Sequence, residues 1–384
     1  MTDSGSRWIR CATGRCWKAC GKRSRRPGKS GTEVRVDLEF WRGRRVFLTG
    51  HTGFKGSWLT LMLKMLRART TGYSLPAPTD PSMFELLGLA SALDHHIGDI
   101  RDLAAMETAM REAQPEIVFH LAAQPLVRAS YAEPVDTFAT NLMGTVNLLD
   151  ACRRVPSVRT VVIVTTDKCY ENTGLTRGYA ESDPMGGQDP YSSSKGCAEL
   201  AVSSYRDSFL RAAGIGVASA RAGNVIGGGD FAIDRLVPDA MRAFCAGNPL
   251  EIRNPAAIRP WQHVLDPLAG YLMLAERLHG DPGFAAGWNF GPAVADAAPV
   301  EAVVDSLIEC WGEDARWVRS PGTHPHEAAT LMLDCSKAGE RLGWHPRLSL
   351  DEALKLSADW YRCWHEQGDL IAISKDQINQ YLSL

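Results

Sequence analysis

Hydrophobic and polar positions along the chain predict strands and helices in turn. The first unit is a short apolar run, Val46–Leu48, followed by a glycine-rich turn and an amphipathic helix with apolar residues from Trp58 to Leu66. Further strand-like runs cover Ile117–Leu121, Val161–Thr165 and Ile215–Ala220. Helical stretches that separate such runs include Pro134–Arg153 and Asp189–Arg211. Because the strands are apolar throughout instead of alternating, they predict an α/β fold with a doubly wound parallel sheet covered by helices on both faces.

The pattern changes after about residue 223. Glycine, proline and asparagine become frequent, and later helices such as Asp351–Glu366 are typical of a smaller α+β region. We therefore expect residues 41–223 to form mainly the sheet domain and residues 224–384 mainly a smaller, substrate-binding α+β region. Since no low-complexity linker separates them, we expect the two to pack directly against each other and to form a cleft, where ligands tend to bind.

Residues 1–40 differ from the rest of the chain in charge. Their first three-quarters are rich in Lys and Arg, hold a single acidic residue, and lack the apolar core of a secretory signal. We expect this stretch to lie outside the fold, either as a disordered extension or because the product begins near Val34 or Val36. Intact-mass spectrometry of the native product that found Met1–Gly31 would contradict the second interpretation.

The composition is that of an ordinary globular protein. The 384 residues have a formal charge of −2, with 45% hydrophobic and 22% charged residues. This balance argues against a general nucleic-acid binder, which needs surplus Lys and Arg to contact phosphates, and no run approaches the roughly 20 apolar residues of a membrane span. The 10 scattered cysteines do not suggest a disulfide framework. We therefore expect a small-molecule partner, no nucleic acid, no membrane, and a reducing, cytoplasmic location.

The glycine-rich turn carries the first candidate chemistry. Gly50, Gly53 and Gly56 have GxxGxxG spacing, directly after the first strand and at the start of the first helix. Glycines there permit a tight turn and let the backbone approach a pyrophosphate, while the helix N-terminus supplies N–H donors and partial positive charge. This context predicts a Rossmann-type dinucleotide-binding domain. The residues expected to bind the dinucleotide are Gly50, Gly53, Phe54, Lys55, Gly56, Asp99, Ile100, Ala122, Ala123, Tyr191 and Lys195.

Two features bear on which dinucleotide is bound. Asp99 lies where a third strand would bring a carboxylate to an adenine amine, and a solvated loop aspartate is the alternative. The end of the second strand, Thr71–Ser74, lacks the acidic residue that holds the ribose hydroxyls of NAD, and Arg67 and Arg69 lie nearby. We expect NAD, and the sequence leaves NADP open.

Tyr191 and Lys195 form the second candidate site. Residues four apart share one face of a helix, so the phenol and the ammonium can converge. We expect the cation to lower the pKa of Tyr191 and make it a base for a hydroxyl that is losing hydride. The alternative is an exposed helix that carries the pair by coincidence. The nearby run Val161–Thr165 leads into Thr166–Lys168 at the edge of the sheet where ligands collect, which favours the catalytic interpretation.

These features resemble the extended short-chain dehydrogenase/reductase family, also described as NAD-dependent epimerases and dehydratases, acting on nucleotide sugars. The resemblance runs from about residue 40 to residue 368. It rests on the blocks Thr49–Trp58, His120–Arg128, Thr166–Asn172, Asp183–Gly187, Asp189–Glu199, Arg259–Val264 and Leu342–Pro346. The first and fifth blocks indicate the superfamily only, whereas the third, fourth and sixth resemble the branch that acts on CDP-glucose.

The resemblance implies a redox-neutral loss of water with a retained cofactor. Tyr191, helped by Lys195, would take the proton from the sugar 4-hydroxyl while hydride leaves C4, and Thr166 would hydrogen-bond the same oxygen. The resulting ketone acidifies the C5 proton, whose loss expels the C6 hydroxyl as water with the help of an acid, and hydride returns to C6. In related dehydratases an acid and a base, Asp and Glu, follow this threonine, so the acid role carries over to Asp167.

The base is left open, because Lys168 stands at its position and an ammonium cannot accept a proton. Burial, together with the positive charges of Lys195 and an oxidised nicotinamide, would lower the pKa of Lys168 and make it neutral. Alternatively Lys168 only orients Asp167 in a salt bridge, and Glu171 or a water molecule is the base. Wild-type solvent-deuterium exchange at C5 in a Lys168→Met variant would exclude Lys168.

The substrate's diphosphate needs cations or N–H donors. Arg259 matches the family position that binds it bidentately. Further candidates for substrate contacts are Gln124, Arg128, Asn224 and Arg235. The string His324-Pro-His326-Glu327 lacks a third well-spaced ligand, so no metal is expected.

The leading hypothesis is a CDP-glucose-type 4,6-dehydratase of deoxysugar and polysaccharide biosynthesis. Another dTDP-, GDP- or UDP-sugar dehydratase or a 4-epimerase is the first alternative, although an epimerase would not need Asp167. The second is a catalytically inactive dinucleotide-binding regulator, which should have lost Tyr191 or Lys195. Two helical stretches, Pro134–Arg153 and Asp189–Arg211, could pair with those of a second copy as in relatives, so we expect a homodimer or homotetramer.

Overall fold

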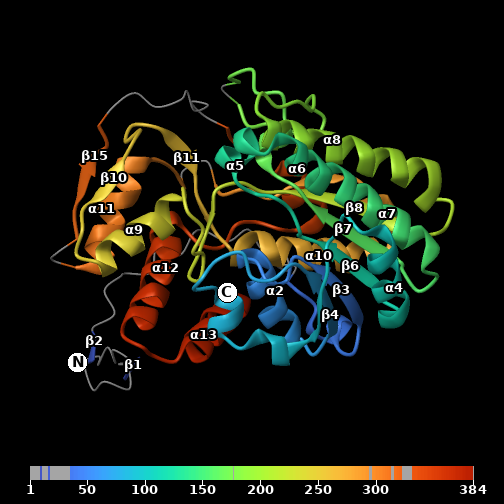
Figure 1. The fold of residues 1–384 in the computed structure, drawn as a ribbon, viewed down its shortest axis with the longest axis horizontal. Coiled ribbons are helices and arrows are strands. Elements are labelled where there is room, and N and C mark those ends of the chain that lie inside the picture. Colours follow the sequence, from blue (N-terminus) through green and yellow to red (C-terminus); the bar gives the residue numbers. More distant parts are fainter. Residues whose placement is uncertain are drawn as a thin grey trace, which may run out of the picture.

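The computed structural model describes residues 9–10, 16–17, 35–175, 177–293, 296–312, 315–321 and 331–383. Figure 1 shows a large sheet flanked by helices and, beside it, a smaller group of helices and short strands. The sheet has seven strands in the order β13-β8-β7-β6-β3-β4-β5, and every neighbouring pair is parallel. Its strands are β3 (Arg45–Thr49), β4 (Arg69–Ser74), β5 (Asp94–Ile97), β6 (Ile117–His120), β7 (Thr160–Val164), β8 (Gly216–Arg221) and β13 (Gly287–Asn289). The predicted doubly wound parallel sheet is confirmed.

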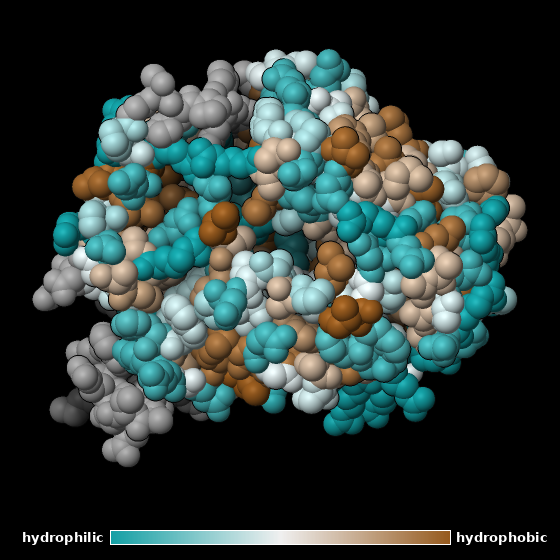
Figure 2. Space-filling view, in the orientation of Figure 1, coloured by the Kyte–Doolittle hydropathy of each residue, from teal (hydrophilic) through white to brown (hydrophobic). Residues whose placement is uncertain are grey.

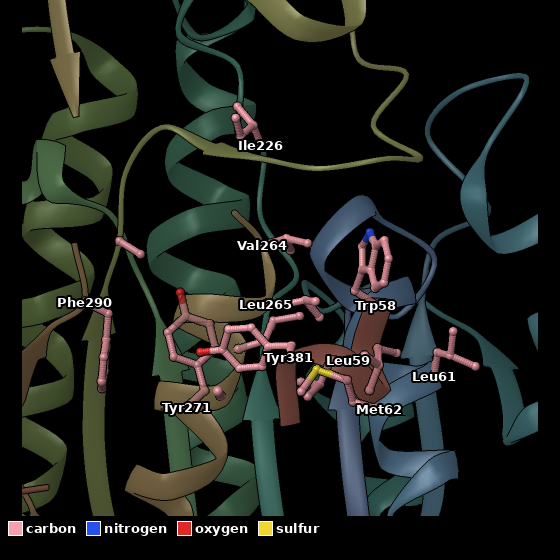
Figure 3. Packing of buried hydrophobic residues seen from close by; sticks show 14 of the residues in the cluster. Trp58, Leu59, Leu61, Met62, Ile226, Val264, Leu265, Tyr271, Phe290 and Tyr381 are labelled. Carbon is pink, nitrogen blue, oxygen red and sulfur yellow. The ribbon is translucent and has the colours of Figure 1, made fainter. Parts of the chain in front are cut away.

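Both faces of the sheet are covered, which explains why its strands are apolar throughout. In β3, Val46 and Leu48 belong to one buried cluster and Phe47 to another, because successive side chains point to opposite faces. The first cluster includes side chains of α2 (Phe54–Met65) and α10 (Leu265–Gly280). Figure 3 shows Leu59 and Met62 of α2 near Leu265 of α10.

The second cluster lies under the helices of the opposite face. Its members come from α4 (Leu103–Ala113), α7 (Gly144–Arg154) and α8 (Pro190–Tyr205). The predicted helical stretch 134–153 is α6 (Pro134–Phe138), one π-helical segment η2 (Ala139–Met143) and α7 in succession. Likewise, α8 continues into the π-helical segment η4 (Arg206–Leu210).

The smaller part contains short strand pairs and helices. Parallel pairs are β9 (Val225–Ile226) with β12 (Gln262–His263) and β10 (Leu250–Ile252) with β15 (Trp317–Arg319), and β11 (Ile258–Pro260) is antiparallel to β14 (Ala297–Pro299). Its helices are α9 (Leu236–Cys245), α11 (Val300–Trp311), α12 (Leu350–His365) and α13 (Leu370–Ser383). Both α10 and β13 return to the large sheet, although they follow residue 223 in the chain.

Short segments complete the described chain. They are β1 (Ile9–Arg10), β2 (Cys16–Trp17), α1 (Leu38–Trp41), α3 (Met83–Leu86), η1 (Leu89–Ala92), α5 (Val127–Ala132), η3 (Asp167–Cys169), η5 (Pro282–Phe284) and η7 (Ala338–Leu342). The buried Trp41 of α1 donates its indole N–H to Glu276 Oε1 of α10 at 2.6 Å. The N–H of Asp37, which precedes the expected boundary at residue 40, donates to the same oxygen at 3.0 Å, so the last residues of the stretch expected to lie outside the fold contact α10. In the described ranges, no helix has the length and apolar character needed to cross a bilayer.

Candidate active site

A cleft of about 1150 Å³ lies at the carboxyl ends of the central strands, where the two parts of the molecule meet. Figure 2 shows the surface hollowed near the middle of this face. In a doubly wound sheet, ligands bind at this edge, next to the point where the strand order reverses. Here that point lies between β3 and β6, because β4 and β5 extend the sheet on one side and β7 and β8 on the other.

The turn between β3 and α2 presents its backbone to the cleft. Gly50 has a φ of +75°, and a Cβ placed there would lie 2.5 Å from the backbone nitrogen of Ala122. A Cβ at Gly56 would lie 2.0 Å from the Gly50 carbonyl oxygen. The N-cap residue of α2, Gly53, has no side chain to cap the helix, so N–H groups of the first turn are left for a ligand. This uncapped, side-chain-free cradle fits a dinucleotide pyrophosphate.

The other residues predicted for the dinucleotide, Asp99, Ile100, Ala122 and Ala123, also line the cleft. The carboxylate of Asp99 accepts hydrogen bonds from Nε of Arg101 at 2.9 and 3.0 Å. These bonds lower the pKa of Asp99, so it is an ionised acceptor held at the cleft wall.

Helix α8 brings Tyr191 and Lys195 to the cleft. The helix begins at Asp189, whose carboxylate accepts a hydrogen bond from the Ser192 N–H at 2.9 Å and caps the helix. Both predicted side chains are buried and line the cleft, and Lys195 Nζ donates to the carbonyl of Val164 at 3.4 Å. The predicted convergence on one face of the helix is therefore present.

The expected electrostatics of this pair differ from what the structure shows. Burial raises the pKa of Tyr191 to about 12 and lowers the pKa of Lys195 to about 8. Burial of the phenol has the largest effect on its pKa and opposes the shift that we expected from Lys195. The groups that act in the expected direction on Tyr191 are the hydroxyl of Thr166, through a hydrogen bond, and the charge of Arg235.

Segment η3 places Thr166 and Asp167 beside Tyr191. Both are buried, and the Thr166 hydroxyl donates to Asp167 Oδ1 at 2.9 Å. Gly223 faces this carboxylate so closely that a Cβ there would lie 1.9 Å from Asp167 Oδ2. Any larger residue at position 223 would displace the Asp167 carboxylate.

Lys168 differs from both predicted roles. Its side chain is exposed at the cleft wall, so the burial that would make it neutral is absent. Within the described ranges it forms no ion pair with Asp167, whose near carboxylate oxygen is engaged by Thr166. Glu171 is exposed and does not line the cleft.

Burial lowers the pKa of another cleft lysine besides Lys195, namely Lys55 in the glycine-rich turn. Burial, reinforced by the charges of Arg235 and Lys195 and opposed by Asp167, lowers its pKa to about 7. Its side chain forms no ion pair with another described residue, and it lines the cleft. Sequence reasoning assigned Lys55 to the dinucleotide through its position in the turn, and only the fold shows where its ammonium lies.

Most of the predicted substrate contacts also come together. Asn224, Arg235, Arg259 and Arg128 line the cleft. Arg235 pairs with Asp230 at 2.9 Å, and Arg128 pairs with Asp234 at the same distance. Gln124 does not line the cleft, because its amide is used internally: Oε1 accepts from Leu126 N at 2.6 Å and Nε2 donates to Thr137 Oγ1 at 3.0 Å.

A buried ion pair that the sequence did not predict lies behind the catalytic wall, the side of the cleft formed by Thr166, Asp167, Tyr191 and Lys195. Arg221 of β8 pairs with Glu199 of α8 at 2.8 Å. Glu199 also accepts hydrogen bonds from Ser219 and from Thr165, the neighbour of Thr166, and Arg221 donates to the Tyr170 hydroxyl. One signal was present in the sequence, since Glu199 follows Lys195 by one helical turn.

Metal ligands are absent from the part of the chain that the structure describes, which holds no group of three or more His, Cys, Asp or Glu residues able to bind an ion. The string His324-Pro-His326-Glu327 lies outside the described residues.

Comparison with known proteins agrees with this geometry. The model of the family described as GDP-mannose 4,6 dehydratase matches residues 47–356. A protein of Salmonella typhimurium named CDP-glucose 4,6-dehydratase is 52% identical over 354 residues, which cover 91% of this chain and 99% of that protein. A dTDP-glucose 4,6-dehydratase of Xanthomonas campestris is 26% identical over 82% of this chain and 92% of its own length.

Solved structures share the fold. A UDP-glucose 4-epimerase of Thermotoga maritima, solved with UDP-glucose, has a TM-score of 0.73 at 24% identity and covers 83% of this chain and 98% of its own. A dTDP-glucose 4,6-dehydratase of Bacillus anthracis, solved in complex with NAD, has a TM-score of 0.70 at 20% identity and covers 86% of this chain and 100% of its own.

Proposed function

The chain belongs to the GDP-mannose 4,6 dehydratase family, and from that premise we propose that it is an NAD-dependent hydro-lyase that converts CDP-glucose to CDP-4-keto-6-deoxyglucose and water. The observation that carries the proposal is the 52% identity to a CDP-glucose 4,6-dehydratase over nearly all of both chains. The cleft supports it, because Thr166, Asp167, Tyr191 and Lys195 meet beside the glycine-rich turn. The product is a starting point for deoxysugar biosynthesis.

The residues of the cleft fit NAD. The cradle of Gly50, Gly53 and Gly56 and the uncapped start of α2 would hold the pyrophosphate, and Asp99 would accept from the adenine amine. When bound, NAD supplies the acceptor for the hydride of sugar C4 and the donor that returns it to C6. No acidic side chain follows β4 to select against a 2′-phosphate, so NADP is the competing cofactor in the experiment below.

Tyr191 accepts the proton of the sugar 4-hydroxyl. Its neighbour Thr166 hydrogen-bonds it and is placed to share that oxygen, and this hydrogen bond favours negative charge on the phenol oxygen. The charge of Arg235 acts on Tyr191 in the same direction. These groups oppose the effect of burial on the phenol. Lys195 lies buried one turn along the same helix.

Asp167 gives a proton to the leaving C6 hydroxyl. The carboxylate is fixed by the Thr166 hydroxyl on one side and by the absence of a side chain at Gly223 on the other. We propose that a water molecule takes the C5 proton, because Lys168 is exposed at the cleft wall and lacks the burial on which its role as a base depends. Glu171 is not proposed, since it does not line the cleft.

The diphosphate of the nucleotide sugar is bound by cationic side chains of the second part. Arg259 and Arg235, with the amide of Asn224, line this half of the cleft, and Arg128 reaches it from α5. A guanidinium can hold a phosphate through two parallel hydrogen bonds.

Incubation of the purified protein with CDP-glucose, beside UDP-, dTDP- and GDP-sugars, with and without NAD or NADP, tests the function. Mass spectrometry and NMR should show loss of one water from CDP-glucose alone, with no net NADH. Reaction of another sugar nucleotide instead would keep the reaction and overturn the substrate. Binding of NAD without any reaction would favour the inactive dinucleotide-binding regulator.

The protein is proposed to act in the cytoplasm as a homodimer or homotetramer. Free thiols at Cys152, Cys169 and Cys197 are consistent with a reducing compartment. Exposed apolar side chains on α6 and α8, Val135 and Leu200, would be covered by a second copy. Light scattering of the protein and of a Val135→Glu variant tests this, since a monomeric wild type would contradict it.

A further inference from the structure

Trp261 holds an unused hydrogen-bond donor on the cleft wall. The residue joins β11 to β12, its side chain is only 8% exposed, and its indole nitrogen Nε1 has no acceptor among the described residues. Among the buried polar side-chain atoms left without a partner in the described ranges, this one alone belongs to a residue that lines the cleft. A buried donor without a partner costs about 1–3 kcal/mol, which a bound acceptor would offset.

The other buried tryptophans show that this fold normally satisfies the indole N–H. The carbonyl of Gly228 accepts from Trp58 at 2.9 Å, and the carbonyl of Asp266 accepts from Trp344 at 3.1 Å. Acceptors also face the indoles of Trp41, Trp288 and Trp360. Trp261 is the exception among the buried tryptophans of the described chain, and it is the one at the cleft.

The neighbourhood of Trp261 indicates which acceptor is missing. Arg259 lies two positions earlier in the chain, in β11, and both residues line the cleft. Arg235 and Asn224 line the cleft as well. A neutral N–H donor beside guanidinium groups is suited to an anionic oxygen, with which it forms a charge-assisted bond.

We propose that the indole N–H of Trp261 donates a hydrogen bond to a diphosphate oxygen of the nucleotide sugar, next to Arg259. The inference rests on the proposed function, because it presupposes a nucleotide-diphosphate substrate. Trp261 is thereby a substrate-binding residue that no part of the sequence reasoning assigned. The signal that would have found it is its position two residues after Arg259 in the chain.

Trp261→Phe removes the donor and keeps an aromatic ring of similar shape. Titration calorimetry of the full-length protein with CDP-glucose, CDP and cytidine measures the consequence. We expect affinity for CDP-glucose and CDP to fall by about tenfold or more, because hydrogen bonds to charged groups are the strong ones. The affinity ratio between variant and wild type for cytidine, which has no phosphate, should stay near one.

Trp344→Phe is the matched control, since it loses an indole N–H that is already bonded to Asp266. It should lower the melting temperature more than Trp261→Phe does and leave nucleotide affinity unchanged. The opposite stability order, or a cytidine affinity that falls as far as the CDP affinity, would overturn the inference. So would a Trp261→Phe variant that binds CDP as the wild type does. A wild type that binds no nucleoside diphosphate at all would overturn the proposed function together with it.

Discussion

Two charged networks flank the cleft, and they are built differently. Behind the catalytic wall, Glu199 and Arg221 pair at 2.8 Å with side chains only 4% and 6% exposed. On the recognition side, where the nucleotide sugar is proposed to bind, Arg128 and Arg253 donate to one oxygen of Asp234 at 2.9 and 3.3 Å. The side chains of these three residues are between 27% and 54% exposed. Both networks hold together segments that are far apart in the chain.

The two networks differ in how easily their side chains can rearrange. The oxygens of Glu199 take further hydrogen bonds from Ser219 and Thr165, so the buried pair is fully engaged and its members have one arrangement. Asp234 and its two arginines are in contact with solvent, which screens their attraction and makes rearrangement inexpensive. The comparison therefore predicts a rigid wall for the chemistry and an adjustable wall for the nucleotide.

The largest expected effect is on the chemistry of the rigid wall. Tyr191→Phe removes the proton acceptor and should reduce kcat by up to about 10,000-fold, the upper range for general base catalysis. The melting temperature should remain close to wild type. Tyr205→Phe, on the same helix, is the control. Steady-state assays that found less than a tenfold loss would place the proton transfer on another group.

The second-largest effect is expected on stability, when one member of the buried Glu199–Arg221 pair is removed. Arg221→Met leaves the Glu199 carboxylate buried without its partner and should lower the free energy of unfolding by about 3–5 kcal/mol. Urea unfolding measures this. The double variant Glu199→Gln/Arg221→Met should be more stable than Arg221→Met alone, because no buried charge remains. A loss below about 1 kcal/mol in the single variant would contradict a rigid wall.

A smaller effect is expected from crowding the acid. Gly223→Ala places a methyl group 1.9 Å from the position of Asp167 Oδ2, so the carboxylate must move. A displacement of about 1 Å commonly costs about 100-fold in rate, and kcat should fall by that order. Gly280→Ala is the control, because nothing lies within 4 Å of a Cβ at that position. Equal kcat values in the two variants would show that the place of Asp167 is not critical.

The smallest effect should come from the recognition side. Asp234→Asn weakens two partly exposed ion pairs and should lower the free energy of unfolding by only about 0.2–1 kcal/mol, and less at high salt. Urea unfolding at low and high ionic strength, beside Arg221→Met, gives the direct comparison. If the two variants lost the same free energy of unfolding, the proposed difference between a rigid catalytic wall and an adjustable recognition side would be wrong.

Much of the catalytic wall was predictable because its signals are local. The apolar runs, the glycine spacing of the turn and the four-residue spacing of Tyr191 and Lys195 depend on neighbours in the chain. The structure places these segments at one edge of a parallel sheet, as expected. The assignment of Asp167 to the same site followed from its place after β7.

The surroundings of single side chains were not predictable in this way. The sequence left open whether Lys168 is buried and predicted a substrate contact for Gln124, whereas the fold exposes Lys168 and engages the amide of Gln124 internally. Lys55 was assigned to the dinucleotide through its place in the turn, and the fold shows that burial lowers its pKa. The sequence assigned no role to Trp261, whose unpartnered indole N–H only the fold shows.

By itself the sequence determined the order of the main strands and helices, the glycine-rich turn between the first strand and the first helix, and the spacing of Tyr191 and Lys195, because hydrophobic periodicity and short motifs act over a few residues. Only the tertiary structure decided that β13 and α10 return to the sheet, that Arg221 pairs with Glu199, and which charged groups are buried. The physical reason is that burial and pairing are set by segments that meet in space from distant parts of the chain, and these surroundings fix the desolvation and the partners of each side chain.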